Sequence, residues 1–220
     1  IKISGELKVG ILKGRREMLE IKADDNLHDL IQADVMDSVL YIKPIKEFSR
    51  AKSQQITITF VEDLKKLSLS DKTELESLQD LFFEDFQLEL RDKAEAYITL
   101  KSTKFKLLNG DDAKVELNLT AQDAYFQLNQ SSSIKALVNA PIFSVDSYEK
   151  SSARIDGDVE DFKLRADQSA SFDGENLTSI RAVVLAQGRS KNIINVTEQL
   201  DLVAKGNTSV ELYNNPKINL

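Results

Sequence analysis

A short motif recurs about every 19 residues along most of this chain, and that period restricts the possible folds. Each copy has a turn-forming residue, then any residue, then Thr, Ser or Ala, usually followed closely by an apolar residue. Asp and Gly suit the first position because both tolerate the backbone of a tight corner. The copies begin at Asp71, Asp92, Asp111, Gln130, Glu149, Asp167, Gly188 and Gly206.

Phenylalanine forms a second row with a similar period. Each member lies four to six residues before a copy of the turn motif, and Val183 continues the row. Scattered core residues would rarely fall in one phase of a repeat, so we expect these rings to stack in the interior. The row consists of Phe86, Phe105, Phe126, Phe143 and Phe162.

The period excludes the common helical repeats, which need about 33 residues or more, and the leucine-rich signature is absent. A parallel β-helix coil of three short strands joined by turns fits about 19 residues. Stacked coils would lie about 4.8 Å apart, the usual spacing of paired strands. The sequence therefore predicts an all-β, parallel β-helix-like solenoid with about 19–20 residues per coil.

The first 60 residues do not follow this period, although they alternate apolar and polar residues as short strands do. The segment 54–61 is β-branched and alternating, which strongly favours a strand. We expect a single domain over 1–220, in which 1–62 form a strand-rich N-terminal layer or cap and 63–220 form the coils. An open solenoid end would expose unpaired backbone, so a cap is expected.

One segment also fits a helix. Leu75, Leu78, Leu81 and Phe82 have helical spacing, and Ser70 could cap the first turn. The repeat instead places 71–73 at a corner. We therefore predict β-structure here, with a loop through 77–80.

Composition excludes several classes of function. The net charge is -7, with 36 acidic and 29 basic residues, so nucleic acid and anionic lipid surfaces are not expected as main partners. There is no cysteine, which excludes disulfides, thiol nucleophiles and cysteine metal sites. No apolar run approaches the roughly 18 residues of a membrane-spanning helix.

The chain lacks the equipment of common enzymes. Its single histidine, His28, lies in a polar stretch, and neither a phosphate-binding loop nor a dinucleotide fingerprint occurs. The carboxylate groups that could serve calcium or hydrolysis are 111–112, 156–158 and 173–175, each of which also fits a plain turn. We predict no enzymatic activity, no cofactor and no metal.

Tyrosine is the best candidate for a binding surface. An exposed aromatic ring can stack on a sugar, whereas a partly buried one only packs in a strand. The candidates for a sugar-stacking platform are Tyr97, Tyr125, Tyr148 and Tyr213.

Several short motifs resemble the head GIN domain, the auto-transporter adhesin family of Bacteroidetes envelope proteins. The N-terminal strands with Val9-Gly-Ile11 and Leu40-Tyr-Ile-Lys43 are similar to those of the family. The corners 92–94, 187–190 and 205–208 and the ending 206–216 look like its Gly and Ser corners and closing Tyr strand, although Asp or Gln replaces Gly at several corners. The resemblance implies a right-handed β-helix-like fold, export to the envelope and no catalytic residues.

The leading hypothesis is an exported, non-enzymatic surface protein, an adhesin that presents a β-solenoid face to a protein or a glycan. The expected location is the periplasm, the outer-membrane surface or the extracellular space. The first alternative is a polysaccharide-active β-helix enzyme, a lyase or hydrolase that uses carboxylates. The second is a lipid carrier with an apolar channel, which stacked phenylalanines in the core would contradict.

Overall fold

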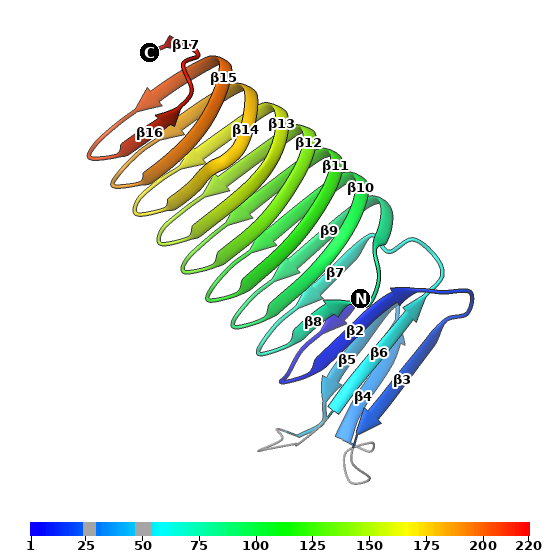
Figure 1. The fold of residues 1–220 in the computed structure, drawn as a ribbon. Coiled ribbons are helices and arrows are strands. Elements are labelled where there is room, and N and C mark those ends of the chain that lie inside the picture. Colours follow the sequence, from blue (N-terminus) through cyan, green and yellow to red (C-terminus); the bar gives the residue numbers. More distant parts are fainter. Residues whose placement is uncertain (24–29, 47–53) are drawn as a thin grey trace.

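Alternating apolar and polar residues make each repeat one long bent strand, and these strands stack in parallel into a solenoid (Figure 1). The computed structural model describes residues 1–23, 30–46 and 54–220. It confirms the predicted all-β fold, since these ranges contain strands and no α-helix. Accordingly, no helix in this part of the chain has the length and apolarity needed to cross a membrane.

Each coil consists of one strand and one tight turn, rather than the three short strands that the sequence led us to expect. The alternation of inward and outward residues shifts by one at the bend, where successive residues face outward, and backbone pairing resumes beyond it; β10 pairs with β11 from Glu95↔Lys114 to Asn109↔Leu128. The strands are β9 (Leu81–Leu90), β10 (Glu95–Asn109), β11 (Lys114–Leu128), β12 (Ser133–Ser147), β13 (Ser152–Ala166), β14 (Ser171–Ala186), β15 (Lys191–Ala204), β16 (Ser209–Tyr213) and β17 (Lys217–Asn219).

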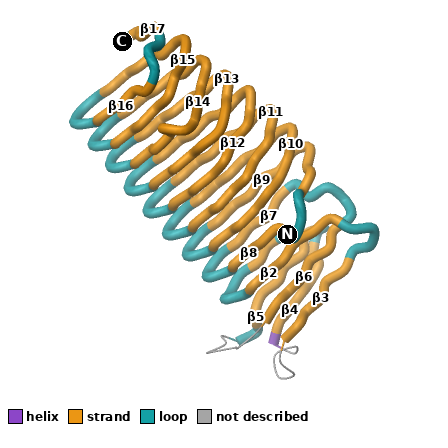
Figure 2. The backbone as a smooth tube through the Cα atoms, viewed as in Figure 1, coloured by secondary structure: helices purple, strands orange, loops and turns teal. Residues whose placement is uncertain are grey.

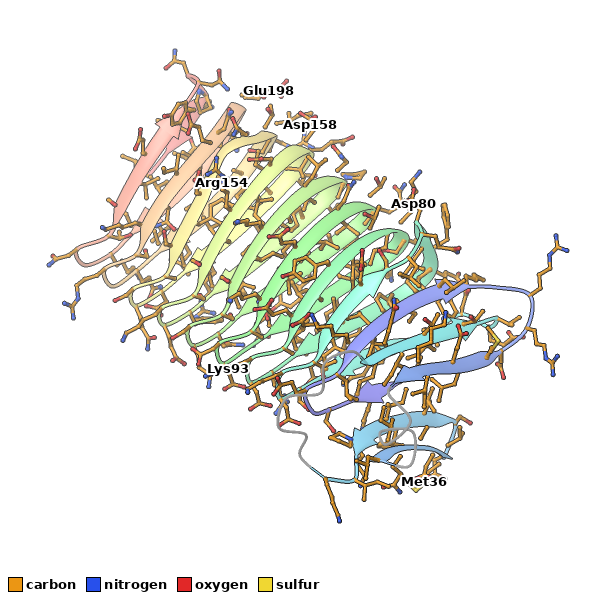
Figure 3. All side chains as sticks on the ribbon, turned by 60° about the horizontal axis from the view of Figure 1, so that its bottom comes forward. Met36, Asp80, Lys93, Arg154, Asp158 and Glu198 are labelled. Atoms are coloured by element: carbon orange, nitrogen blue, oxygen red, sulfur yellow. The ribbon has the colours of Figure 1, made fainter. Side chains whose placement is uncertain are left out.

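The bend divides each long strand between two faces of a flattened stack, and the turns line one edge (Figure 2). In Figure 3, Lys93 lies on this turn edge, Asp80, Asp158 and Glu198 lie on the opposite bend edge, and Arg154 lies between them. We call the two sheets face A and face B. Face A comprises 74–77, 95–100, 114–119, 133–138, 152–157, 171–177, 191–196 and 209–213, and face B comprises 86–90, 105–109, 124–128, 143–147, 162–166, 182–186 and 200–204.

The corner motif is confirmed at seven of its eight positions, because each of those first residues has a positive φ. At the sixth copy, the prediction that the corner begins at Asp167 was wrong by one residue. Gln168, with a φ of 57°, takes the left-handed position in place of Asp167. Consequently the small residue that packs inside this corner is Ala170, which is fully buried, and not Ser169.

Small residues line the inside of the turn edge, directly behind the corners. They stack on one another coil after coil, so a larger side chain would have no room there. Hydroxyl groups in this row bond to neighbouring atoms; Ser132 Oγ, for example, donates to the Asn109 carbonyl oxygen over 3.0 Å. The fully buried members are Thr73, Ala94, Ala113, Ser132, Ser151, Ala170 and Ser190.

Acidic or amide side chains at successive corners form a hydrogen-bonded ladder along the turn edge. The Asp92 carboxylate accepts from the N–H of Asp71 over 3.0 Å, and the Asp111 carboxylate accepts from the N–H of Asp92 over 2.9 Å. The ladder begins at the Gly5 N–H and ends at Gln130, whose side-chain oxygen accepts from the Asp111 N–H. It gives a physical reason for Asp and Gln at corners where Gly would satisfy the backbone alone.

The five phenylalanines of the repeat are buried and stack in the interior, as predicted. Phe126, however, occupies the adjacent inward position, opposite Leu107, while Ala124 takes the position opposite Phe105 and Phe143. The Phe126 ring contacts the rings on both sides, with centroids 6.0 and 4.9 Å away. The ring of this coil therefore lies two residues later than the rings of the coils on either side, and an alanine takes the usual ring position.

Val183 does not continue this row. It points outward and is 49% exposed, whereas Ala182 pairs with Phe162 and is buried. The ring of Phe172, which comes from face A, lies 5.4 Å from that of Phe162 and extends the stack past this alanine.

The N-terminal segment both extends and caps the stack. Strands β1 (Lys2–Ile3) and β2 (Lys8–Lys13) pair in parallel with β7 (Lys66–Leu69) and β8 (Glu74–Ser77), so the stacking of coils begins before residue 63. Next come β5 (Val39–Pro44) and β6 (Gln54–Phe60), parallel to β1 and β2. The outermost strands, β3 (Met18–Ala23) and β4 (Ile31–Met36), are antiparallel and cover that end.

The segment that also fitted a helix is β-structure, as predicted. Strands β8 and β9 flank a short connection at 78–80. Leu75 and Leu81 are buried, whereas Leu78 and Phe82 are exposed, which is the alternation of strands and not the stripe of a helix.

Candidate functional site

The four candidate tyrosines lie on different parts of the solenoid and do not form one platform. Tyr97 is on face A in β10, and Tyr213 is on face A at the opposite end, in β16. Tyr125 is on face B, and Tyr148 follows face B at the turn edge. Only Tyr125 and Tyr148 come near each other.

Tyr125 and Tyr148 are engaged in a polar cluster. The Tyr125 hydroxyl donates to Asp146 over 2.8 Å, and the Arg165 guanidinium lies 5.6 Å from the centroid of Tyr148. Lys106 approaches the ring of Tyr125 to 5.8 Å. Burial, and then the bond to Asp146, raise the pKa of the Tyr125 hydroxyl. Their neighbouring cations leave these rings less free to stack on a ligand.

Tyr97 lies in a different setting, between two carboxylates of the same outward row of face A. The strand register pairs it with Glu76 of β8 on one side and Glu116 of β11 on the other. Adjacent strands are about 4.8 Å apart, so one aromatic ring stands between two acids. Two cations follow in the next coils, so the row reads Glu76, Tyr97, Glu116, Lys135, Arg154, Asp173.

Hydrogen bonds tether the Tyr97 side chain although its ring is 43% exposed. Its hydroxyl donates to Glu95 Oε2 over 2.9 Å, and Glu95 Oε1 accepts from Lys114 Nζ over 2.9 Å. The hydrogen bond to Glu95 raises the pKa of the Tyr97 hydroxyl, so the phenol stays neutral. A tethered aromatic side chain loses less conformational freedom on binding than a free one does.

The surface of face A is hollowed on both sides of this ring. One hollow of about 470 Å³ runs towards Arg154, and another of about 590 Å³ runs towards β2; both are lined by Glu76 and Tyr97. Leu78 lines the second, where it packs against Gly10; a Cβ at Gly10 would lie 2.7 Å from a Leu78 methyl carbon. Together the two hollows form a shallow, open groove on face A, and Tyr97 stands between them.

The groove offers groups for hydrogen bonding and for stacking. It brings together an aromatic ring, carboxylates, the Asn118 amide and the Arg154 guanidinium. The charges pair only loosely, since Lys135 lies 3.9 Å from Glu116 and Arg154 lies 4.0 Å from Asp173. Exposed pairs of this kind hold their partners weakly. Among the described residues, no group of acidic or histidine side chains could hold a metal ion.

The three carboxylate groups noted in the sequence lie in separate structural features. The Asp111 carboxylate belongs to the turn ladder. Gly157, between Asp156 and Asp158, has a φ of 126° at a shift in strand register. Asp173 accepts a hydrogen bond of 3.3 Å from the N–H of Glu175, at another such shift. His28 lies outside the described residues.

The sequence prediction names Tyr97 as a candidate but not the groove residues around it. The repeat carried the missing signal, because moving from Tyr97 by one coil at a time leads to Glu76 in one direction and to Glu116 in the other. The same period that places the corners and the core therefore also places these outward residues. The missed groove residues are Glu76, Leu78, Glu116, Asn118, Lys135, Leu137 and Arg154.

Solved structures share this fold, among them the following three. Two are described as a "putative adhesin". One is from Bacteroides fragilis NCTC 9343, with 18% identity, a TM-score of 0.56 and coverage of 99% of this chain and 91% of that one, and the other is from Parabacteroides merdae ATCC 43184, with 14% identity, a TM-score of 0.53 and coverage of 100% and 90%. The third, from Parabacteroides distasonis ATCC 8503, is described as a "Putative lipid binding protein", with 14% identity, a TM-score of 0.61 and coverage of 99% of this chain and 87% of that one. At these identities the likeness concerns the fold alone.

No curated protein matches the sequence significantly. A family model described as "Putative auto-transporter adhesin, head GIN domain" matches residues 1–216. The match spans both the N-terminal layer and the coils. The chain therefore belongs to the head GIN domain family.

Proposed function

We propose that this chain is a non-enzymatic binding module that is exported and acts at the cell surface, and that face A is its binding face. The family and the two adhesin-like structures support an adhesive role. The observation that carries the choice of face is the tethered Tyr97 ring between Glu76 and Glu116, with a hollow on either side.

A wide β-sheet face suits this role. Solenoids present long, repetitive surfaces whose outward residues recur in every coil, so a ligand can contact several coils at once. Face A also carries charges of both signs. Two acids flank Tyr97, and two cations, Lys135 and Arg154, come next in the row. This charge pattern favours polar ligands that run along the stack.

Lipid transport is the other function that the comparisons bring up, through the structure from Parabacteroides distasonis. The interior argues against a lipid channel here, because the phenylalanine rings fill the space between the faces with centroids 4.1 to 6.1 Å apart. A lipid would have to bind outside the core. The proposed role therefore rests on the surface and not on a cavity.

The test is binding of the purified chain to extracellular proteins and glycans displayed on an array, with one variant per face. Glu116→Arg places a cation beside Tyr97 on face A, and Lys163→Glu alters face B. We expect binding that Glu116→Arg weakens and Lys163→Glu leaves unchanged. Silence across the array, or loss only with Lys163→Glu, would contradict the proposal. Surface labelling of intact producing cells with an antibody to the chain tests export.

A further inference from the structure

We propose that the groove around Tyr97 binds a neutral glycan built of hexopyranose units, with one sugar ring stacked on Tyr97. This inference rests on the proposed binding function and names its ligand class. The Tyr97 ring, the two flanking acids and the paired backbone of face A support it.

The Tyr97 ring supplies a stacking surface. A pyranose has an apolar face of C–H groups, which packs against an aromatic ring while its hydroxyls point outward around the rim. The bonds from Tyr97 to Glu95 and from Glu95 to Lys114 restrain the ring before any ligand arrives. Preorganisation of this kind lowers the entropic cost of binding.

The flanking acids supply acceptors where the sugar hydroxyls would lie. A carboxylate accepts two or more O–H donors, and such charge-assisted bonds are stronger than neutral ones. Within the described ranges, no hydrogen bond or ion pair reaches the Glu76 carboxylate, and Glu116 has only the exposed contact to Lys135 at 3.9 Å. Both carboxylates are therefore available to a ligand.

Charge disfavours an acidic polysaccharide at this position. Glu76 and Glu116 stand directly beside Tyr97 and would repel a uronate or a sulfate stacked on the ring, whereas the cations of the lining, Lys135 and Arg154, lie one and two coils beyond Glu116. Asp156 adds a third carboxylate to the lining. The Asn118 amide, which also lines the groove, can bond a hydroxyl without adding charge. A neutral sugar meets acceptors here without meeting repulsion.

Backbone pairing disfavours an extended peptide. Strand β10 pairs with β8 on one side and with β11 on the other, so face A has no free strand edge beside Tyr97. A peptide laid on the face would leave many of its own N–H and C=O groups without partners. A glycan has no backbone of that kind and bonds through hydroxyls that side chains can reach.

The test is isothermal titration of the purified chain with neutral oligosaccharides of glucose, mannose and galactose, beside uronate oligomers of equal length. We expect at least one neutral series to bind and the uronates not to. Tyr97→Ala should weaken binding about tenfold or more, as loss of a central aromatic anchor does. Tyr97→Phe keeps the ring and should stay within about threefold of the parent.

The matched control is Tyr213→Ala, which removes an exposed tyrosine from the far end of the same face and should leave affinity unchanged. Thermal melting of every variant verifies that it folds. Failure of all neutral series, or equal binding by the parent and Tyr97→Ala, would overturn the inference. If array binding survives periodate oxidation of the glycans, the proposed function stands but the glycan assignment is overturned. If the chain binds nothing on the array, both are overturned.

Discussion

The Asp111 carboxylate accepts a hydrogen bond of 2.9 Å from the backbone N–H of Asp92, one coil earlier. The N–H of a left-handed corner residue points along the solenoid axis, and the next corner side chain provides its partner. Asp111 itself has a φ of 56°, so this position combines an unfavourable backbone with a stabilising side-chain bond. The turn edge is therefore held by side chains as well as by its backbone ladder.

Removing one rung of that ladder should lower stability. Asp111→Ala takes away the acceptor for Asp92 while keeping a Cβ in a left-handed backbone, and we expect a loss of about 1–2 kcal/mol in the free energy of unfolding. Asp111→Asn keeps an acceptor oxygen and should lose less than half of that. Urea unfolding followed by circular dichroism measures both. Asp112→Ala, in the same turn but outside the ladder, is the control and should change little.

The Phe126 ring lies one inward position away from Ala124, so we expect these two core positions to be energetically coupled. Ala124→Phe alone would overfill the space that the Phe126 ring occupies, and should cost about 1–3 kcal/mol. Adding Phe126→Leu reproduces the Phe105 and Leu107 pair of the previous coil and should recover much of that loss. A double-mutant cycle by chemical unfolding measures the coupling, and strictly additive losses would contradict the packing described here.

Gly157 should tolerate no side chain. Its φ is 126°, and an added Cβ would lie 2.0 Å from the Val138 carbonyl oxygen, an atom that the strand ladder holds in place. We expect Gly157→Ala to cost about 2 kcal/mol or more. Gly110→Ala is the comparison, because its nearest atom would be the end of the Gln130 side chain, 3.3 Å away. Equal melting temperatures for the two variants would show that Gly157 is not constrained.

Glu89 should make stability depend on acidic pH. Its carboxylate lies 2.6 Å from Lys66 Nζ and 2.8 Å from Arg91, and the bond from Lys66 above all holds its pKa below the usual range. A carboxyl with a lowered folded-state pKa stabilises the fold above its unfolded pKa of about 4.3, and that contribution disappears as the pH falls through the lower folded value. Glu89→Gln should thus be less stable than the parent at pH 7.

The same variant should approach the parent in stability as the pH falls through the lowered folded-state pKa of Glu89, because protonation neutralises that carboxyl. Unfolding free energies at pH 7, 5, 4, 3 and 2 test this, with the exposed Glu84→Gln as a control. A constant difference between Glu89→Gln and the parent across that range would contradict the account.

Local residue chemistry made the fold predictable from the sequence. Asp71, Asp92 and Asp111 carried the corner signal, and the recurring phenylalanines carried the core. The errors arose where packing within a coil outweighs the period. The ring of one coil lies at Phe126 and not at position 124, a shift that the spacings of 21 and 17 residues to Phe105 and Phe143 already carry. Phe172 enters the stack from the other face and leaves no such trace.

The candidate site was less predictable, because a binding surface depends on which faces are outward. Tyr97 and Tyr125 look alike in the sequence, yet one ring faces an open groove while the other is engaged with Asp146 and Lys106. That difference follows from the neighbouring coils, whose side chains the sequence alone does not place. The strand register shows which side chains of the neighbouring coils surround each ring.

Hydroxyl-radical footprinting, read by mass spectrometry, tests most directly which face binds. Leu78, Tyr97 and Leu137 on the groove side are 44%, 43% and 43% exposed, while Phe82, Ile142 and Val183 elsewhere are 54%, 45% and 49% exposed, so both sets start from similar accessibility. With bound ligand, the account predicts that oxidation falls at the first three residues and is unchanged at the other three. Protection of Phe82, Ile142 and Val183 with undiminished oxidation of Tyr97 would contradict it.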